Sequence, residues 1–278
     1  MGSRIFASGL LEGQVAVVTG AGSGLGRAIA VELAACGATV VAVGRRPDPL
    51  EETAALCDDG RCEPMTCDIR EEDEVAALVG GVLERHGRID VLVNNAGGQF
   101  LAPAEDVSPK GFRAVTRLNL EGTWLMTHAV ATRAMIPAGG GGVVSVTLTP
   151  RNGMPGMVHS GAARAGVENM TRTLSVEWAR FGVRLNAVAA GYFDTEVLAK
   201  YPRVMREAMA GTVPVQRLGR PEEIAWLVTY LAGPAAAFMT GAVLPLDGGR
   251  ENWLGPWPPP EMLDEEGRPP AEERRPKD

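Results

Sequence analysis

Tyrosine and lysine are scarce in this chain of 278 residues. Its three tyrosines and three lysines are Tyr192, Tyr201, Tyr230, Lys110, Lys200 and Lys277. A catalytic mechanism that needs a phenol beside an ammonium group therefore has few places to put them.

Signals for a membrane, a secretory route or a nucleic acid are also missing. No segment approaches the roughly 18 consecutive apolar residues of a membrane-spanning helix. The opening stretch 1–11 is too short for a signal sequence, and the last three residues are not a peroxisomal address. The formal net charge of −7 argues against a basic binding surface. We expect a cytoplasmic protein that binds neither nucleic acid nor membrane.

Cysteine is limited to four residues, Cys36, Cys57, Cys62 and Cys67. Three of them lie five apart, which is not the Cys-x-x-Cys spacing of zinc sites. We therefore expect no metal site, and we interpret the cysteines as reduced structural thiols.

The composition that remains is that of a folded globular protein, with 45% hydrophobic and 22% charged residues. Strand and helix patterns alternate from about residue 13 to 249. Short apolar runs such as Val15–Thr19 are typical of parallel strands buried on both faces, and helical spacing follows in 27–36, 72–85, 162–179 and 221–231. This alternation predicts an α/β, Rossmann-type, doubly wound parallel sheet.

The predicted organisation has one domain. An N-terminal extension covers 1–12, the domain 13–250, and a Pro-rich charged tail 251–278. The tail has too few apolar residues to form a core of its own.

A glycine-rich segment, 19–26, follows the first strand and opens the first helix. Glycines allow a tight turn and a close approach of backbone to a pyrophosphate, and the helix N-terminus offers free N–H groups and partial positive charge. This strand–turn–helix context indicates a dinucleotide site. The residues assigned to it are Gly20, Ser23, Gly24, Leu25 and Gly26.

The second strand ends in Arg45 and Arg46, where an NAD enzyme would carry a carboxylate for the ribose 2′-hydroxyl. Guanidinium groups suit a 2′-phosphate, so we expect NADP(H) rather than NAD(H). The third strand is predicted to end in Asp68 and Ile69. Asp68 either accepts a hydrogen bond from the adenine amino group or serves as a capping or turn residue.

Four segments together resemble the short-chain dehydrogenase/reductase family over about residues 10–250. They are the glycine pattern 19–26, Asn-Asn-Ala-Gly at 94–97, Leu-Asn-Leu at 118–120 and Leu-Asp-Gly-Gly at 246–249. The resemblance implies one Rossmann domain per chain, a homotetramer or homodimer, and a substrate that lies over the nicotinamide.

The resemblance also implies roles for individual residues. It places Asn95, Ala96, Gly97 and Thr195 beside the cofactor. It also gives Asn119 the position that holds a water of the family's proton relay.

The family's catalytic Tyr and Lys are replaced here by Ser160 and Arg164, and Leu148 stands near its Ser position. A Ser hydroxyl is a poor general acid. Arg164 can hold ribose hydroxyls but cannot shuttle protons, because an arginine guanidinium ordinarily stays protonated. Ordinary alcohol oxidation or ketone reduction is therefore disfavoured.

The active-site helix, 159–168, is similar to that of peroxisomal trans-2-enoyl-CoA reductase-like members, although Glu168 stands where that branch has Tyr. Reduction of an enoyl thioester asks less of a side-chain acid, because charge collects on the thioester oxygen and the site needs donors aimed at it. Ser160 and Tyr192 are the candidate donors, and His159 fits a surface or capping role better than catalysis.

The resulting hypothesis is an NADP(H)-dependent oxidoreductase that reduces an enoyl thioester, such as an acyl-CoA, or another activated double bond. Two alternatives stay open. One is a degenerate member that binds NAD(P) but does non-redox chemistry or acts as a partner or sensor protein. The other is a carbonyl reductase with a relocated acid such as Tyr192.

Overall fold

The computed structural model describes residues 2–148, 153–196, 198 and 203–253. Within them, one parallel sheet has the order β3-β2-β1-β4-β5-β6-β7. Its strands are β1 Val15–Thr19, β2 Thr39–Gly44, β3 Cys62–Thr66, β4 Val91–Asn94, β5 Gly141–Leu148, β6 Val183–Ala190 and β7 Val243–Leu246. The predicted Rossmann-type sheet is confirmed.

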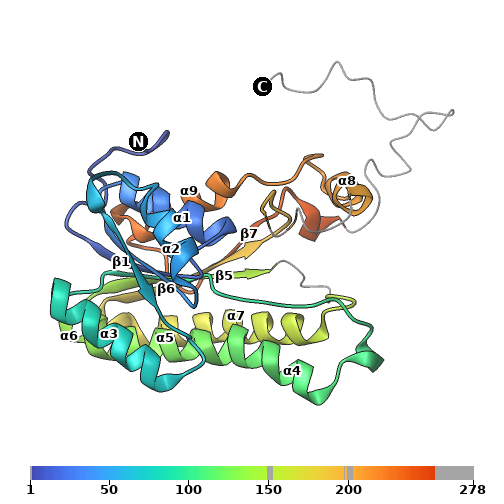
Figure 1. Ribbon diagram of the computed structural model, residues 1–278, viewed down its shortest axis with the longest axis horizontal. Coiled ribbons are helices and arrows are strands. Elements are labelled where there is room, and N and C mark those ends of the chain that lie inside the picture. The colour runs from blue at the N-terminus through green and yellow to red at the C-terminus, as the bar shows by residue number, and fades with distance from the viewer. Residues whose placement is uncertain (1, 149–152, 197, 199–202, 254–278) are drawn as a thin grey trace.

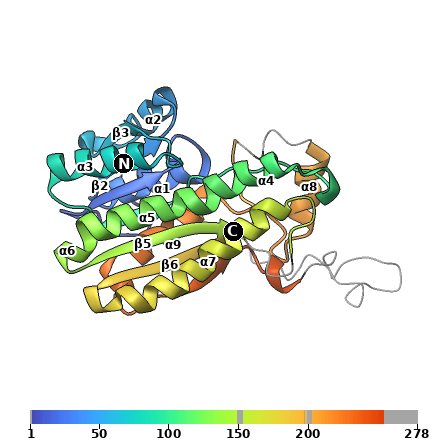
Figure 2. The ribbon, with the colours of Figure 1, turned by 90° about the horizontal axis from the view of Figure 1, so that it is seen from below.

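Helices cover both faces of this sheet (Figure 1, Figure 2). Helices α1 (Gly24–Ala35), α2 (Pro47–Ala54) and α9 (Pro221–Ala232) lie on one side, and α1 packs closely on α9. On the other side lie α3 Glu72–His86, α4 Pro109–Thr116, α5 Gly122–Val130, α6 Ile136–Ala138 and α7 Val158–Trp178. Helix α8 (Arg203–Gly211) stands at the end of the sheet (Figure 1). None of the helices described is long and apolar enough to cross a bilayer.

Each buried strand contributes to two cores, because alternate side chains point to opposite faces. Val18 packs with Ile29 of α1 and Ile224 of α9. Its neighbour Val17 packs with Val79 of α3 and Met126 of α5. This is why the strands appear in the sequence as continuous apolar runs rather than as alternating patterns.

The last part of the N-terminal extension, around Leu11, packs into the core of the domain. Leu11 is fully buried in the core beside α1 and α9, and its N–H donates to the Cys36 carbonyl over 2.9 Å. Helices α2, α4 and α6 were not predicted from sequence, and in the continuation of α4 through α5 only Leu118–Leu120 was expected to be helical, from the family resemblance. That continuation contains two π-helical turns, Arg117–Glu121 and Ala131–Met135, and each disturbs the 3.6-residue period on which the prediction relied.

Candidate active site

The carboxyl ends of β1 and β4 meet the first turn of α1, and the side chains of Thr19 and Asn95 hold this junction by bonding to main-chain groups. The Thr19 hydroxyl donates to the Val93 carbonyl over 3.2 Å and accepts the N–H groups of Asn95 and Ala96, both at 3.0 Å. The Asn95 amide donates to the carbonyls of Thr19 at 3.0 Å and Gly20 at 3.3 Å. The two loops are therefore fastened together at the site predicted for the cofactor.

Glycine is required here by space as well as by conformation. Gly20 and Gly24 have φ of +67° and +53°, in the left-handed region. A Cβ on Gly26 would lie 2.2 Å from the Gly20 carbonyl oxygen and 2.4 Å from the Asn95 amide nitrogen. The backbone at Gly26 therefore lies too close to Gly20 and Asn95 to leave room for any side chain.

Helix α1 begins at Gly24, three residues earlier than predicted. Its N-cap residue, Ser23, makes no side-chain capping hydrogen bond, so the first turn keeps donors for an anion. Leu25 packs partly on the core, and the Thr195 side chain lies 3.7 Å from where a Gly24 Cβ would be. The structure therefore brings together the five predicted loop residues and Thr195.

Arg45 and Arg46 follow β2 and are exposed. Neither guanidinium group has a hydrogen bond or ion pair with any residue of the described part of the chain. Arg46 is the N-cap residue of α2. Both charges are consequently available to an anionic ligand.

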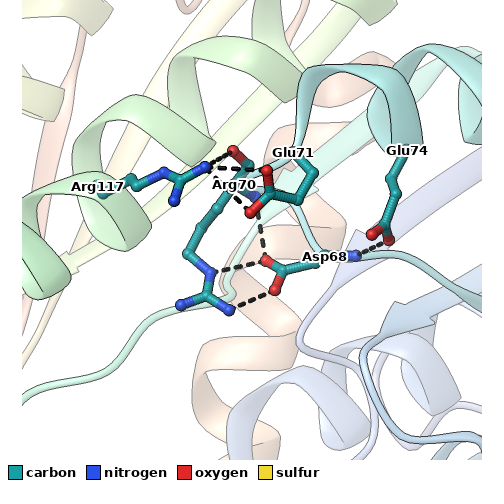
Figure 3. A network of polar contacts seen from close by, with 5 residues as sticks. All are labelled: Asp68, Arg70, Glu71, Glu74 and Arg117. Carbon is teal, nitrogen blue, oxygen red and sulfur yellow. Dashed lines mark hydrogen bonds and ion pairs between the residues drawn. The ribbon is translucent and has the colours of Figure 1, made fainter.

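Asp68 lies in a network of charged side chains between β3 and α3 (Figure 3). Its carboxylate accepts from Nε of Arg70 over 2.8 Å and also from Nη2 of Arg70, and its N–H donates to Glu74 over 2.7 Å. The Arg70 guanidinium lowers the pKa of Asp68 to about 2. Both carboxylate oxygens are thus engaged within the protein, which is the arrangement of a turn-fixing Asp.

Two further contacts hold this segment against α4 and α5. Nη2 of Arg117 donates to the Arg70 carbonyl at 3.0 Å and to the Glu71 carboxylate at 2.9 Å (Figure 3). Ile69 is buried, and its side chain would lie 2.9 Å from a Cβ on Gly122.

Arg164 lies on α7 and is 8% exposed. Its Nη1 donates to the Val146 carbonyl over 2.8 Å, whereas its Nε is buried without a partner. No carboxylate in the described structure pairs with it, and burial lowers its pKa to about 10. Its Nη2 would lie 2.1 Å from a Cβ on Gly97, so the guanidinium reaches the 94–97 segment. A buried cation of this kind favours a ligand that offers acceptors.

Asn119 is fully buried in the first π-helical turn. Its side-chain oxygen accepts from the Gly98 N–H at 2.9 Å, and its amide donates to the Gly98 carbonyl at 3.0 Å. Its own carbonyl accepts from Thr123 at 2.9 Å. The side chain therefore fixes the loop that follows β4.

Ser160 is buried at the start of α7, and its hydroxyl donates to the Gln99 side-chain oxygen over 2.8 Å. This contact turns the amide of the exposed Gln99 so that its N–H groups are left as donors. Gln99 was missed from sequence. The available signal was a polar side chain two residues after the 94–97 segment.

His159 is fully buried and does not lie on the surface, and it is not the N-cap residue of α7, which is Met157. Its Nδ1 accepts the Ser160 N–H over 2.7 Å. Its ring lies edge-on to Phe100, with 4.3 Å between centroids. Desolvation lowers the pKa of His159, which favours the neutral imidazole.

Tyr192 lies elsewhere. The Arg250 guanidinium is 4.4 Å from the centre of its ring. The phenol lines a cavity of about 130 Å³ together with Phe193, Leu246 and Asp247, and neither Ser160 nor Arg164 lines that cavity.

Glu168 accepts from the Thr147 hydroxyl at 3.2 Å, next to Leu148.

The sequence and the fold of this chain were compared with those of known proteins, and both match one family. Residues 20–251 match the family model described as "Enoyl-(Acyl carrier protein) reductase". A solved short chain dehydrogenase from Bacillus anthracis has 36% identity and a TM-score of 0.81, covering 87% of this chain and 97% of that one. The chain belongs to the short-chain dehydrogenase/reductase family.

Two other family members are informative about chemistry. A probable 2,4-dienoyl-CoA reductase of Bacillus subtilis is 36% identical, with 89% of this chain and all of that protein covered. The solved citronellol catabolism dehydrogenase (AtuB) of Pseudomonas aeruginosa PAO1 is 45% identical, with a TM-score of 0.80 and coverage of 89% and 98%. The short-chain dehydrogenase/reductase chain described here is accordingly an oxidoreductase.

Membership of the family implies a nicotinamide dinucleotide. The residues fit one: a glycine-lined helix N-terminus for the pyrophosphate, free arginines beyond β2, and a buried guanidinium with an unpartnered Nε. Within the described residues, no group of three or more His, Cys, Asp or Glu side chains could hold a metal ion.

Proposed function

We propose that this enzyme uses NADPH to reduce the activated double bond of an enoyl thioester, with an acyl-CoA as the substrate class. The observation that carries the proposal is the Ser160–Gln99 hydrogen bond. It presents amide donors beside Arg164 in a site whose family Tyr and Lys are both absent.

The bound cofactor would supply the hydride to the β-carbon. Arg45 and Arg46 bind the 2′-phosphate, and the first turn of α1 binds the pyrophosphate. Arg164 donates to the ribose hydroxyls from a guanidinium that is already desolvated, and Asn95, Ala96 and Gly97 line the same edge.

The reacting carbonyl needs hydrogen-bond donors rather than a strong acid. Negative charge develops on the thioester oxygen, where Gln99 Nε2 donates and Ser160 holds the Gln99 amide in orientation. Asn119 fixes Gly98 and thereby the position of Gln99. The α-carbon takes its proton from water, and Tyr192 is the phenol to test for a share in that transfer.

Consumption of NADPH with crotonyl-CoA and longer enoyl-CoA substrates tests this function. Gln99→Ala should lower kcat about 10²-fold, the usual loss for one such donor, and Ser160→Ala should lower it less. Ser175→Ala is the matched control, because Ser175 lies on the same helix and its hydroxyl donates to the Arg172 carbonyl. If the wild type consumes no NADPH with any enoyl-CoA, the proposal is wrong.

Cofactor choice has its own test. The double variant Arg45→Ala/Arg46→Ala should raise the Kd of NADPH more than tenfold and leave that of NADH unchanged, as read by fluorescence. Tight NADPH binding without turnover of enoyl or carbonyl substrates would favour the degenerate, cofactor-binding alternative. Assembly as a homotetramer or homodimer stays a prediction, which light scattering can measure.

A further inference from the structure

Two cysteines that the proposed chemistry does not use lie on either side of one tight turn. Cys57 is the N-cap residue of the 3₁₀ turn Asp58–Gly60, and Cys62 is the first residue of β3. Gly60, with φ of +65°, and a hydrogen bond from the Arg61 N–H to the Asp58 carbonyl close the turn. The chain therefore reverses between the two thiols.

The thiols interact directly, as a side-chain hydrogen bond joins them. Cys62 belongs to the core between α1 and the sheet, and Cys57 packs against that core. The Cys57 thiol also donates to the Thr53 carbonyl over 3.5 Å. A short turn that brings two thiols into hydrogen-bond contact makes them a candidate pair for an intramolecular disulfide.

The two thiols differ in access. Cys57 is half-buried and lines a cavity of about 360 Å³ with Leu56, Asp58 and Arg61, whereas Cys62 is buried beneath it. The hydrogen bond with Cys62 lowers the pKa of Cys57, and burial raises the pKa of Cys36 to about 11 and that of Cys67 to about 12. An accessible thiol beside a buried one is the arrangement of a reactive cysteine and its resolving partner.

We propose that Cys57 and Cys62 form a dithiol that hydrogen peroxide oxidises to an intramolecular disulfide. The Cys57 thiolate attacks one peroxide oxygen, the O–O bond breaks, and Cys57 becomes a sulfenic acid as hydroxide leaves. The Cys62 sulfur then attacks the Cys57 sulfur, forming the S–S bond and expelling hydroxide. The two thiol protons convert the hydroxides to water, so two thiols and one peroxide yield one disulfide and two waters.

Peptide mapping of the full chain tests the pair. Arg61 lies between the two cysteines, so trypsin separates them and only a disulfide keeps residues 46–61 joined to 62–70. After brief exposure to peroxide, we expect this joined pair and a fall in free thiols from four to two. Reduction should restore all four.

Variants separate this pair from the other cysteines. Cys67→Ser and Cys36→Ser should form the joined peptides as the wild type does, whereas Cys57→Ser should keep its remaining thiols. In Cys62→Ser, Cys57 should stop at the sulfenic acid, which dimedone traps. The proposal is overturned if Cys67→Ser abolishes the joined peptides, if the bond forms between chains, or if all four thiols survive.

Discussion

The two halves of the proposed active site are built by different means. The dinucleotide half is made from backbone: glycines without room for a Cβ, a helix N-terminus, and the hydroxyl and amide of Thr19 and Asn95 bonded to main-chain groups. The reacting half is made from side chains, namely Gln99, Ser160 and Arg164. Backbone sites tolerate little change, whereas side-chain sites can be rewritten residue by residue. Under the proposed function, this difference accounts for a site that keeps the cofactor loop while Ser160 and Arg164 stand where the family resemblance expects Tyr and Lys.

The largest effect is expected when a single methyl group is added to the glycine-rich cofactor loop. Gly26→Ala places a Cβ 2.2 Å from the Gly20 carbonyl oxygen, so the loop must move. We expect loss of about 1–3 kcal/mol of stability and more than 10²-fold weaker NADPH binding, measured by urea unfolding and fluorescence titration.

The matched change is Gly81→Ala in α3, where the nearest atom is the Met65 methyl at an ordinary 3.5 Å. It should leave NADPH binding unchanged and raise helix stability slightly. Equal effects of the two variants would contradict a special role for the loop.

In the reacting half, Arg164→Met should change stability and binding in opposite directions. Burial lowers the folded-state pKa of Arg164 to about 10, well below the ordinary guanidinium value, so the buried charge costs roughly 3 kcal/mol at every pH below 10, and the cost falls as pH rises further. Removing it should stabilise the free enzyme by about 1–2 kcal/mol, after loss of the bond to Val146. NADPH should nevertheless bind at least tenfold more weakly, by fluorescence titration.

Arg184→Met is the control for that variant. Arg184 is also partly buried, but it donates to the carbonyls of Leu231, Ala236 and Met239. Its loss should destabilise the fold by about 2 kcal/mol and leave cofactor binding unchanged. A destabilised Arg164→Met would show that Arg164 is a structural residue like Arg184.

The variant Asp68→Asn tests the ion pair between Asp68 and Arg70, which lies between β3 and α3. The folded-state pKa of Asp68 is depressed from 3.8 to about 2, so its ion pair with Arg70 contributes stability that is complete above pH 3.8 and is lost as pH falls toward 2. We expect the variant to lose about 2 kcal/mol at pH 7 and much less at pH 2.5, in urea unfolding. A difference that does not depend on pH would contradict the ion pair.

The smallest effect is expected for Tyr192→Phe. The ring stacks beneath Arg250, and its hydroxyl has no hydrogen-bond partner among the described residues. If the ring only packs, kcat with enoyl-CoA should change less than twofold. A loss of 10²-fold or more would instead show that this phenol donates a proton.

The backbone features of the site could be predicted from sequence, whereas the orientations of its side chains could not. The glycine pattern and the buried strands depend on local conformation, so the sheet and the cofactor loop were predictable from 19–26 and from apolar runs. Gln99 could not be found in this way, because its orientation depends on Ser160, 61 residues away. The Arg70 clamp on Asp68 was equally invisible, since a carboxylate at that position fits a ligand contact as well as a turn. Most of the helical continuation after α4 was missed because π-helical turns shift the period of the apolar residues.

The π-helical turn around Asn119 has a consequence for how the enzyme can diverge. Such a turn is wound more loosely than the α-helix, as if one extra residue were present. Deleting one residue from Arg117–Glu121 would restore regular winding and leave the flanking helical turns in place, but it would change the direction of the side chains within the turn itself. Asn119 would then no longer face Gly98, and the loop carrying Gln99 would lose its fastening although every active-site side chain was still encoded. Length in this short stretch is therefore as much a part of the active site as residue identity.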